Sequence, residues 1–425
     1  MTRAASPKLG AYAGLVALGL LAALVLGLPE LVALSAPFAL TLAVGLASAH
    51  EPHLDVGVRL GSERALEGDE VPLIVELRSG PATIERAEVL VALPAGLRAT
   101  RPNPAAVRLL PHAHLDVDMT VHARRWGAYL PGDVLVRVYD RFGLVSWETE
   151  YDRRAPLKVF PKGEALRSLL RPVETQVFAG NQVARQKGEG IEFADIRAFA
   201  AGDRIRRINW RASARRQELW VNELHTERNA DVIIFLDSFA EAVNLRGEST
   251  LDLAVRASAS LATGYLRHKD RVGFVSFGGI LNWLLPGTGL RQIYRMVDSL
   301  LDTEIILNYA WKDLDVIPSR TLPPKALILA LTPLLDDRAA GALLDLRARG
   351  FDLAIVEVSP EPFAAPGATA EEQLAYRIWR LRREATRARY ERAGVSVAVW
   401  SEEAPFAAAL EEVRAYRRHA RVVRA

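Results

Sequence analysis

A basic and aromatic segment runs from Gly190 to Glu223, and in it arginines alternate with phenylalanines and tryptophans. Arginine binds carboxylates and phosphates bidentately and also stacks on aromatic rings, so a segment of this composition is suited to specific pairing. The Gly202-Asp203 pair near its middle indicates a turn, because glycine tolerates positive φ. We expect Asp203 to cap a helix that begins near Arg204 by accepting hydrogen bonds from its backbone amides.

The segment allows three interpretations. Its arginines could pair with Glu192, Asp195 or Glu223 and so hold neighbouring domains together, which is the commoner role of such pairs. They could instead form an exposed docking surface, where arginine and tryptophan are favoured anchors. Phosphate binding is the third interpretation, but the chain has no loop of the Gly-x4-Gly-Lys-Ser/Thr kind. We therefore expect no nucleotide hydrolysis by this chain.

Length and composition narrow the classes of protein. At 425 residues the chain exceeds one comfortable hydrophobic core, so two or three domains are expected. The net charge of +3 is too small for a nucleic-acid binder. The absence of cysteine excludes disulfides, thiolate metal sites and a cysteine nucleophile. The eight histidines are scattered, so we expect no zinc site.

Residues 1–50 predict a transmembrane helical hairpin. The stretches 11–28 and 31–49 carry no charge, and each is about the length that crosses a hydrocarbon core of about 30 Å. Residues 47–49 resemble a signal-peptide cleavage site, but the apolar region before them is far longer than the roughly 7–15 residues of a signal core. We therefore interpret the region as a membrane anchor in the lipid bilayer.

The charges beside the hairpin predict its orientation. Arg3 and Lys8 precede the first span, whereas the turn carries only Glu30, which favours a cytoplasmic N-terminus. Two crossings return the chain to the same side. We therefore expect a multi-pass protein of the cytoplasmic membrane with the bulk of the chain, after His50, in the cytosol.

Residues 51–160 predict a β-sandwich of the immunoglobulin type. Apolar residues alternate with polar ones in short runs such as 71–77 and 134–138, bounded by turn residues such as Gly68-Asp69. Two elements stand out within it: Arg125-x-Gly127-x-Tyr129, and Asp140-x-Phe142-Gly143-Leu144. We expect them to form a buried aromatic corner and a tight turn.

Residues 161–230 then form a signature segment that links the sandwich to residues 231–425, an α/β domain. Expected strands are 232–237, 272–277, 280–285, 326–331, 353–358 and 395–400, and expected helices are 249–268, 290–301, 336–349, 371–392 and 405–419. This alternation predicts a doubly wound parallel sheet covered on both faces. Ligands of such sheets lie beyond the carboxyl ends of the strands, which is where Asp237 falls.

This domain resembles a von Willebrand factor type A domain, whose metal-dependent adhesion site carries Asp-x-Ser-x-Ser at this strand end. Asp237 matches the first position, but Phe239 and Glu241 stand at the serine positions. Thr288 is the candidate for the loop threonine, and Thr332 follows the strand after which the family carries an Asp. Because oxygen ligands are lost, we predict a degenerate metal site without bound Mg²⁺ or any other cofactor. Its remnant consists of Asp237, Ser238 and Thr288.

The segment before Asp237 closely resembles the bacterial family called domain of unknown function fifty-eight, which places this signature before a von Willebrand A domain. The matching positions are Gly190, Glu192, Phe193, Arg197, Gly202, Asp203, Arg206, Trp210, Ser213, Arg215 and Glu223. The two sandwich elements and the membrane hairpin are typical of the same family. Ala201 and Asn209 depart from its usual Pro and Asp.

The resemblance implies an association with MoxR-type AAA+ ATPases. We therefore expect a membrane-anchored, non-enzymatic adaptor that presents a von Willebrand A-like domain to such a cytosolic ATPase in protein complex maturation or stress response. Related von Willebrand A proteins are further candidate partners. One alternative is an envelope adhesion or receptor protein, which needs an outward-facing bulk and a working metal site. Another is a serine hydrolase, with Ser213 or Ser238 as nucleophile and His225 or His268 as base, but no Gly-x-Ser-x-Gly elbow is present.

The expected helix 371–392 is rich in arginine. Such a face beside a membrane anchor could attract anionic lipid, at about 1 kcal/mol per basic residue near the surface. The commoner interpretation is a solvated face whose charge is offset by neighbours such as Glu384 and Glu391.

Overall fold

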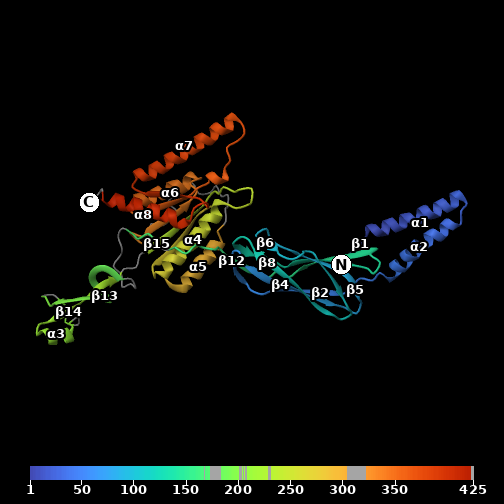
Figure 1. The fold of residues 1–425 in the computed structure, drawn as a ribbon, viewed down its shortest axis with the longest axis horizontal. Coiled ribbons are helices and arrows are strands. Elements are labelled where there is room, and N and C mark those ends of the chain that lie inside the picture. The colour runs from blue at the N-terminus through green and yellow to red at the C-terminus, as the bar shows by residue number, and fades with distance from the viewer. Residues whose placement is uncertain are drawn as a thin grey trace. The chain divides into compact units, whose positions relative to one another are not determined.

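The computed structural model describes residues 1–166, 168–172, 183–200, 203, 205, 208–227, 231–303 and 322–422. The chain divides into two compact units, Met1–Pro161 and Lys162–Ala425 (Figure 1). The first unit contains the apolar helices and a β-structure, and the second contains the signature segment and the α/β domain.

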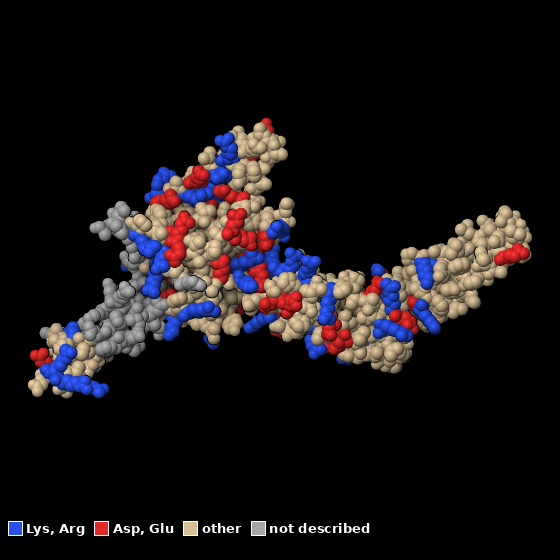
Figure 2. All heavy atoms as spheres, in the orientation of Figure 1, with Lys and Arg blue, Asp and Glu red and all other residues tan. Residues whose placement is uncertain are grey.

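Two apolar helices open the chain, as predicted. Helix α1 spans Pro7–Leu26 and α2 spans Glu30–Ser48; by length and composition both could cross a membrane. Ser6 caps α1 by accepting a hydrogen bond from the Lys8 amide, and Gly27 ends the helix at φ +69°, a conformation that glycine adopts without strain. Figure 2 shows both helices almost free of charged side chains.

Two antiparallel sheets make up most of the rest of the first unit. Their strand orders are β1-β11-β10-β5-β7 and β2-β4-β8-β6, and β3, β12 and β9 form a third small sheet. The strands are β1 Thr2–Ala5, β2 Leu54–Leu60, β3 Arg64–Leu66, β4 Glu70–Ser79, β5 Ile84–Ala92, β6 Leu97–Ala99, β7 Ala105–Leu109, β8 His114–Ala123, β9 Gly127–Tyr129, β10 Asp133–Tyr139, β11 Val145–Asp152 and β12 Leu157–Phe160.

The period-two pattern buries one face of each sheet. In β4, alternate residues such as Leu73 and Val75 are buried and belong to the same hydrophobic cluster as Val89 of β5 and Val136 of β10. The two sheets therefore share one core.

The Asp140–Leu144 element is a turn that joins this β-structure to the helices. The Asp140 carboxylate accepts hydrogen bonds from the amides of Phe142 (3.1 Å) and Val145 (2.7 Å). Leu144, completely buried, packs against Leu9 and Leu42 of the two helices. In addition, the Lys8 ammonium donates to the carbonyl of Phe142 (2.7 Å). The first residues of the chain, which the sequence did not predict to be a strand, pair with β11 beside this turn.

Replacing Asp140 with alanine should loosen this junction. Two amides would lose their acceptor, which is expected to lower the free energy of unfolding of the first unit by about 1–2 kcal/mol. The thermal unfolding midpoint of the detergent-solubilised chain measures the effect. Asp116→Ala, an exposed carboxylate on β8, is the control and should change stability by less than about 0.5 kcal/mol. Equal effects of the two substitutions would contradict this role of Asp140.

The Arg125–Tyr129 element forms the expected aromatic corner. The Tyr129 hydroxyl donates to the carbonyls of Arg125 (2.9 Å) and Trp126 (3.1 Å), and the Trp126 side chain is buried. Gly127 has φ +153°, and a Cβ there would approach the Tyr129 ring to 3.0 Å. A side chain at this position would therefore disturb the corner.

The second unit contains a six-stranded sheet of order β17-β16-β15-β18-β19-β20, parallel except for the edge strand β17. Its strands are β15 Asp231–Ser238, β16 Arg271–Gly278, β17 Leu281–Gly287, β18 Leu327–Thr332, β19 Asp352–Val358 and β20 Ser396–Trp400. Its helices are α4 Thr250–Arg267, α5 Gly289–Leu301, α6 Asp337–Ala348, the short 3-10 helix η2 Glu361–Phe363, α7 Ala370–Arg392 and α8 Phe406–Val422.

Helices cover the two faces of this sheet. Phe235 of β15 and Ile355 of β19 form one cluster with Leu343 of α6 and Tyr390 of α7. The alternate residues of β15 point to the opposite face, and α4 packs on the same strand. The order of strands reverses between β15 and β18, so a switch point lies where these two strands end.

The signature segment forms a separate small element within this unit. Strands β13 (Val183–Ala198) and β14 (Trp220–Glu227) pair antiparallel, and the short helix α3 (Trp210–Arg216) lies between them in the sequence.

Candidate functional site

Asp237 lies at the switch point of the α/β sheet, and its carboxylate is satisfied within the chain. Asp237 is only 2% exposed to solvent. Oδ2 accepts a hydrogen bond from the Thr332 hydroxyl (2.6 Å) and Oδ1 accepts one from the Phe239 amide (3.1 Å). Burial raises the pKa of Asp237 to about 7, because an ionised carboxylate is poorly solvated there. The sequence identified Asp237 but not Thr332 as its partner.

The Phe239 side chain, which follows the end of β15, is part of a buried hydrophobic cluster. Its ring is buried and meets the Phe277 ring edge-on, with centroids 5.0 Å apart. The Arg338 guanidinium lies over the ring, 4.3 Å from its centroid, and is itself paired with Asp336 (2.7 Å). This hydrogen bond from Arg338 lowers the pKa of Asp336. The crevice is thus closed by an aromatic ring and an ion pair.

Thr288 does not lie near Asp237, and its assignment to the metal-site remnant is wrong. Strand β17 runs antiparallel to its neighbour β16, so Gly287 pairs with Val272, whereas Asp237 pairs with Phe277. Thr288 therefore lies at the other end of the strands from Asp237, about five residues or roughly 16 Å away along the strand direction. The signal was present in the sequence, because the short Gly278-Gly279 turn between the two strands requires them to be antiparallel.

Ser238, the third member of the expected remnant, contacts another hydroxyl side chain. It is buried, and its hydroxyl lies 3.2 Å from the hydroxyl of Ser276. Among the described residues, no three His, Asp or Glu side chains come together as a metal-binding group. With both Asp237 oxygens engaged and Phe239 in the crevice, the residues present do not fit a directly coordinated Mg²⁺ ion.

Two of the signature residues that the structure describes bind each other. Arg197 and Asp203 form a bidentate pair, with both N···O distances 2.7 Å, and Asp203 also accepts from the Ala200 amide. The helix expected to begin near Arg204 lies largely outside the described residues. The short helix α3 begins at Trp210, and its cap is Asn209, whose side chain accepts from the Ala212 amide (3.0 Å).

Three further signature residues, all on α3, differ in exposure. Ser213 is buried; it donates to the Asn209 carbonyl (2.8 Å) and accepts from the Trp220 amide (2.9 Å), which fixes α3 against β14. Trp210, by contrast, is 65% exposed, and Arg215 is exposed on the same helix. Figure 2 shows several basic side chains over α3.

The remaining signature positions are described only in part. Gly190, Glu192 and Phe193 lie on β13 and Glu223 lies on β14. Gly202 and Arg206 lie outside the described residues.

The geometry does not favour the serine hydrolase alternative. Within the described part of the chain, the hydroxyls of Ser213 and Ser238 are buried and their recorded partners are not histidines. His268 follows the C-terminal end of α4, an 18-residue helix about 27 Å long, whereas Ser238 lies near the edge where α4 begins. His225 lies on β14, with its side chain outside the described set.

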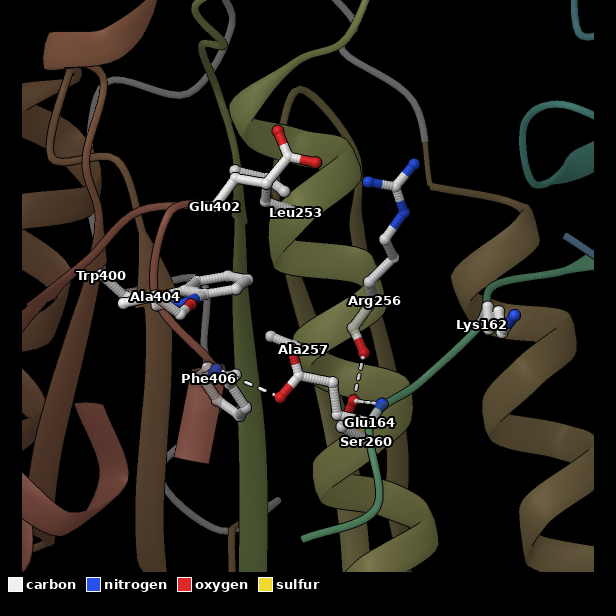
Figure 3. Close-up of a pocket in the computed structure, with 10 residues that line it drawn as sticks. All are labelled: Lys162, Glu164, Leu253, Arg256, Ala257, Ser260, Trp400, Glu402, Ala404 and Phe406. Atoms are coloured by element: carbon white, nitrogen blue, oxygen red, sulfur yellow. Dashed lines mark hydrogen bonds between the residues drawn. The ribbon is translucent and has the colours of Figure 1, made fainter. Parts of the chain in front are cut away.

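A small pocket lies where the chain after Pro161 crosses α4 and the start of α8 (Figure 3). Glu164 connects α4 to α8 in this pocket. Its amide donates to Ser260 Oγ of α4 (2.8 Å), and its carboxylate accepts from the Phe406 amide (3.1 Å) at the N-terminus of α8. The volume of about 120 Å³ is well below that of typical ligand sites. The geometry is that of a structural joint, in which a distant carboxylate caps a helix.

A buried charge cluster that the sequence did not predict lies next to the crevice. Glu357, at the end of β19, is fully buried and is paired with Arg383 and Arg387 of α7. Arg383 also donates to the carbonyls of Pro333 (2.8 Å) and Leu334 (3.4 Å), in the loop that follows Thr332. The interpretation of these α7 arginines as a solvated face is therefore wrong for Arg383, which is buried. The spacing of Arg383 and Arg387, one turn apart, was the available signal.

Comparison with family models gives one match for this part of the chain. Residues 195–361 match the family described as protein of unknown function DUF58. The match supports the DUF58 resemblance and covers about half of the signature segment together with the first five strands of the α/β sheet, which is less than half of the chain.

Other comparisons add little. No curated protein matches the chain. Among solved structures, a FixG-related protein from Vibrio parahaemolyticus matches at 9% identity over 25% of this chain and 95% of that one, with a TM-score of 0.19. Native alpha-2-macroglobulin from Escherichia coli matches at 17% identity over 30% of this chain and 20% of that one, with a TM-score of 0.21. The cupredoxin domain of amoB from Nitrosocaldus yellowstonii matches at 8% identity over 25% of this chain and 86% of that one, with a TM-score of 0.18. These TM-scores are too low to support any inference.

Proposed function

We propose that this chain is a membrane-anchored, non-enzymatic adaptor that presents its α/β domain to a cytosolic MoxR-type AAA+ ATPase. The observation that carries the proposal is the contrast between two places in the second unit. The switch-point crevice is filled by Phe239 and Arg338, whereas Trp210 and Arg215 are exposed. Recognition by an exposed surface thus fits this domain better than chemistry in the crevice.

We infer that the α/β domain is a von Willebrand A scaffold with a lost metal site. The strand order with a single antiparallel edge strand and an acid at the end of the first strand, Asp237, support this inference. In the same way, the two sheets that share one core support an immunoglobulin-like β-sandwich. Both assignments agree with the DUF58 resemblance, whose members combine such domains.

The anchoring part of the proposal rests on α1 and α2. Arg3 and Lys8 lie before the first helix and Glu30 lies at the turn, which favours a cytoplasmic N-terminus. A hairpin of two spans would then leave both units on the cytosolic side, where an AAA+ ATPase can reach them. Protein complex maturation and stress response are the processes in which we place this pair.

The partner contact is proposed at α3. Tryptophan and arginine dominate the binding energy of many interfaces, and α3 exposes Trp210 beside Arg211 and Arg215. Its backbone is held in place by Asn209 and Ser213, so that these side chains are presented on a defined helix. An ordered helix loses less conformational entropy on binding than a disordered segment does.

Trp210→Ala should weaken ATPase binding at least about tenfold, because loss of a central tryptophan anchor commonly costs 2 kcal/mol or more. The full chain in lipid nanodiscs and the purified MoxR-type ATPase of the same organism would be compared by a direct binding titration. Trp283→Ala, a second exposed tryptophan on β17, is the matched control and should change the Kd less than about twofold. Failure of the wild-type chain to bind, or equal weakening by both substitutions, would refute the proposal.

A further inference from the structure

Helix α7 presents two different faces. One face holds the helix to the sheet. Its residues recur at helical spacing and are buried or half-buried, among them Tyr376, Trp379, Arg383, Arg387 and Tyr390. Figure 1 shows the N-terminal part of α7 extending along the edge of the α/β domain.

The opposite face carries an exposed aliphatic stripe. Leu374, Ile378 and Leu381 are 56%, 45% and 62% exposed, and Ala385, also exposed, continues the series. Their spacing of four, three and four residues is the a/d repeat of a coiled coil. Three large aliphatic side chains in such a row on one helix predict a partner helix, because isolated exposed aliphatics have no such periodicity.

We propose that this stripe binds the same stripe of a second copy of the chain, with the two α7 helices antiparallel about a twofold axis. Ile378 would then lie opposite Leu381 of the partner copy, and Leu374 opposite its Ala385. Each contact occurs twice, as a twofold-symmetric interface requires. The inference goes beyond the proposed adaptor function and takes from it only the membrane anchoring.

The charges beside the stripe favour this occupant and this direction. Arg377 and Glu384 are exposed on the same flank, seven residues apart. In the antiparallel pair, Arg377 of each copy faces Glu384 of the other, which gives two attractive pairs. On the other flank, Arg382 faces Ala375. A parallel pair would instead place Arg377 opposite Arg382, which is repulsive.

The proposed interface is small, so we expect it to be stable only when both copies are anchored in the same membrane. Three large aliphatic residues per copy bury little area by the standards of a stable dimer in solution. Two copies anchored in one membrane meet at a high effective concentration, which strengthens weak contacts without adding new ones. We therefore expect the pair to form in membranes.

The chain contains no cysteine, so introduced thiols can test the geometry directly. Two versions of the full chain, Leu374→Cys and Ala385→Cys, would carry different tags and be co-expressed, and their membranes would be oxidised mildly. The antiparallel pair predicts a disulfide between the two versions, while two Leu374→Cys copies stay unlinked because about 11 residues, or roughly 16 Å, separate those positions along the helix axis. Absence of the mixed disulfide, or preferential linkage of two Leu374→Cys copies, would overturn the proposal.

Charge reversal supplies a second measurement in the same membranes. Arg377→Glu and Glu384→Arg are each expected to lower the mixed disulfide about fivefold, and the double variant R377E/E384R should restore it, because both attractive pairs are re-formed. Arg382→Glu is the matched control and should leave the yield nearly unchanged. If none of these substitutions changes the yield of the mixed disulfide, or if the double variant gives no more disulfide than the single variants, something other than a second α7 covers the stripe.

Discussion

Arg383→Ala is expected to destabilise the α/β domain by about 3–5 kcal/mol, the usual cost of removing one partner from a buried ion pair. Both Arg383 and Glu357 are almost completely inaccessible to water. Without the guanidinium, the Glu357 carboxylate would keep only Arg387, whose Nε lies 2.9 Å from Oε2. The carbonyls of Pro333 and Leu334 would lose a donor as well.

The effect should be largest near the switch point. Arg383 holds the loop that follows Thr332, and Thr332 in turn donates to Asp237. Hydrogen exchange of the full chain in detergent, followed by mass spectrometry of peptides from β18 and β19, measures the local free energy of opening. These peptides should lose most of their protection in the Arg383→Ala variant.

Two comparisons separate this pair from general damage to α7. Arg382→Ala changes the neighbouring, exposed arginine and should alter protection by less than about 0.5 kcal/mol. The double variant Arg383→Met with Glu357→Leu removes both charges and should recover part of the lost stability, because no uncompensated carboxylate remains. Unchanged protection in Arg383→Ala would show that the pair contributes little to this fold.

The elements of both units could be predicted well from the sequence because their patterns are local. Two uncharged stretches of membrane-spanning length, separated by Pro29-Glu30, correspond to α1 and α2 within a few residues. Period-two runs such as 71–77 correspond to β4, and the apolar run before Asp237 corresponds to β15. Burial of alternate or continuous apolar residues dictates these elements with little help from distant parts of the chain.

The contacts of the candidate site could be predicted only where local sequence decides them. Asp237 was identifiable because a buried strand ends on it. Its pairing with Thr332 joins positions 95 residues apart, and that depends on β18 lying directly beside β15. Thr288 was misplaced although the Gly278-Gly279 turn, too short for a parallel crossover, already requires β17 to run antiparallel to β16.

The pairing of arginines was equally hard to predict. Local composition offered Arg197 several acids, and the structure pairs it with Asp203 in the next turn. Arg383 looked like one of many charges on a solvated helix, but the face of α7 that meets the sheet includes it. Which arginine is buried follows from how a helix packs, and this is not a property of the helix alone.

Asp237→Asn is expected to make stability nearly independent of pH where the wild-type chain is pH-sensitive. The pKa of Asp237 is about 7 in the folded protein, against an ordinary value of 3.8. Between these two values the folded state keeps a proton that the unfolded state has released. Stability is therefore complete below about pH 4 and falls as the pH rises to about 7, by up to about 1.4 kcal/mol per pH unit.

Asparagine has the shape of the protonated carboxyl group and does not ionise. The variant should match the wild-type chain near pH 4 and exceed it by about 2–4 kcal/mol at pH 8, where the wild-type carboxylate is ionised and buried. The thermal unfolding midpoint, measured for both chains in detergent from pH 4 to pH 8, gives this difference directly. Comparing the two chains at each pH cancels the contributions of all other titrating groups.

Asp336→Asn is the control with the opposite sign. Because the Arg338 hydrogen bond lowers the pKa of Asp336, its contribution to stability is present above about pH 4 and is lost only as the pH falls further. The difference between this variant and the wild-type chain should therefore stay constant from pH 5 to pH 8. A constant difference for Asp237→Asn as well would mean that Asp237 is ionised throughout and that its crevice is better solvated than its burial indicates. A difference that grows with pH would instead show that a carboxyl group close to half protonation at neutral pH, hydrogen-bonded to Thr332, lies at the switch point.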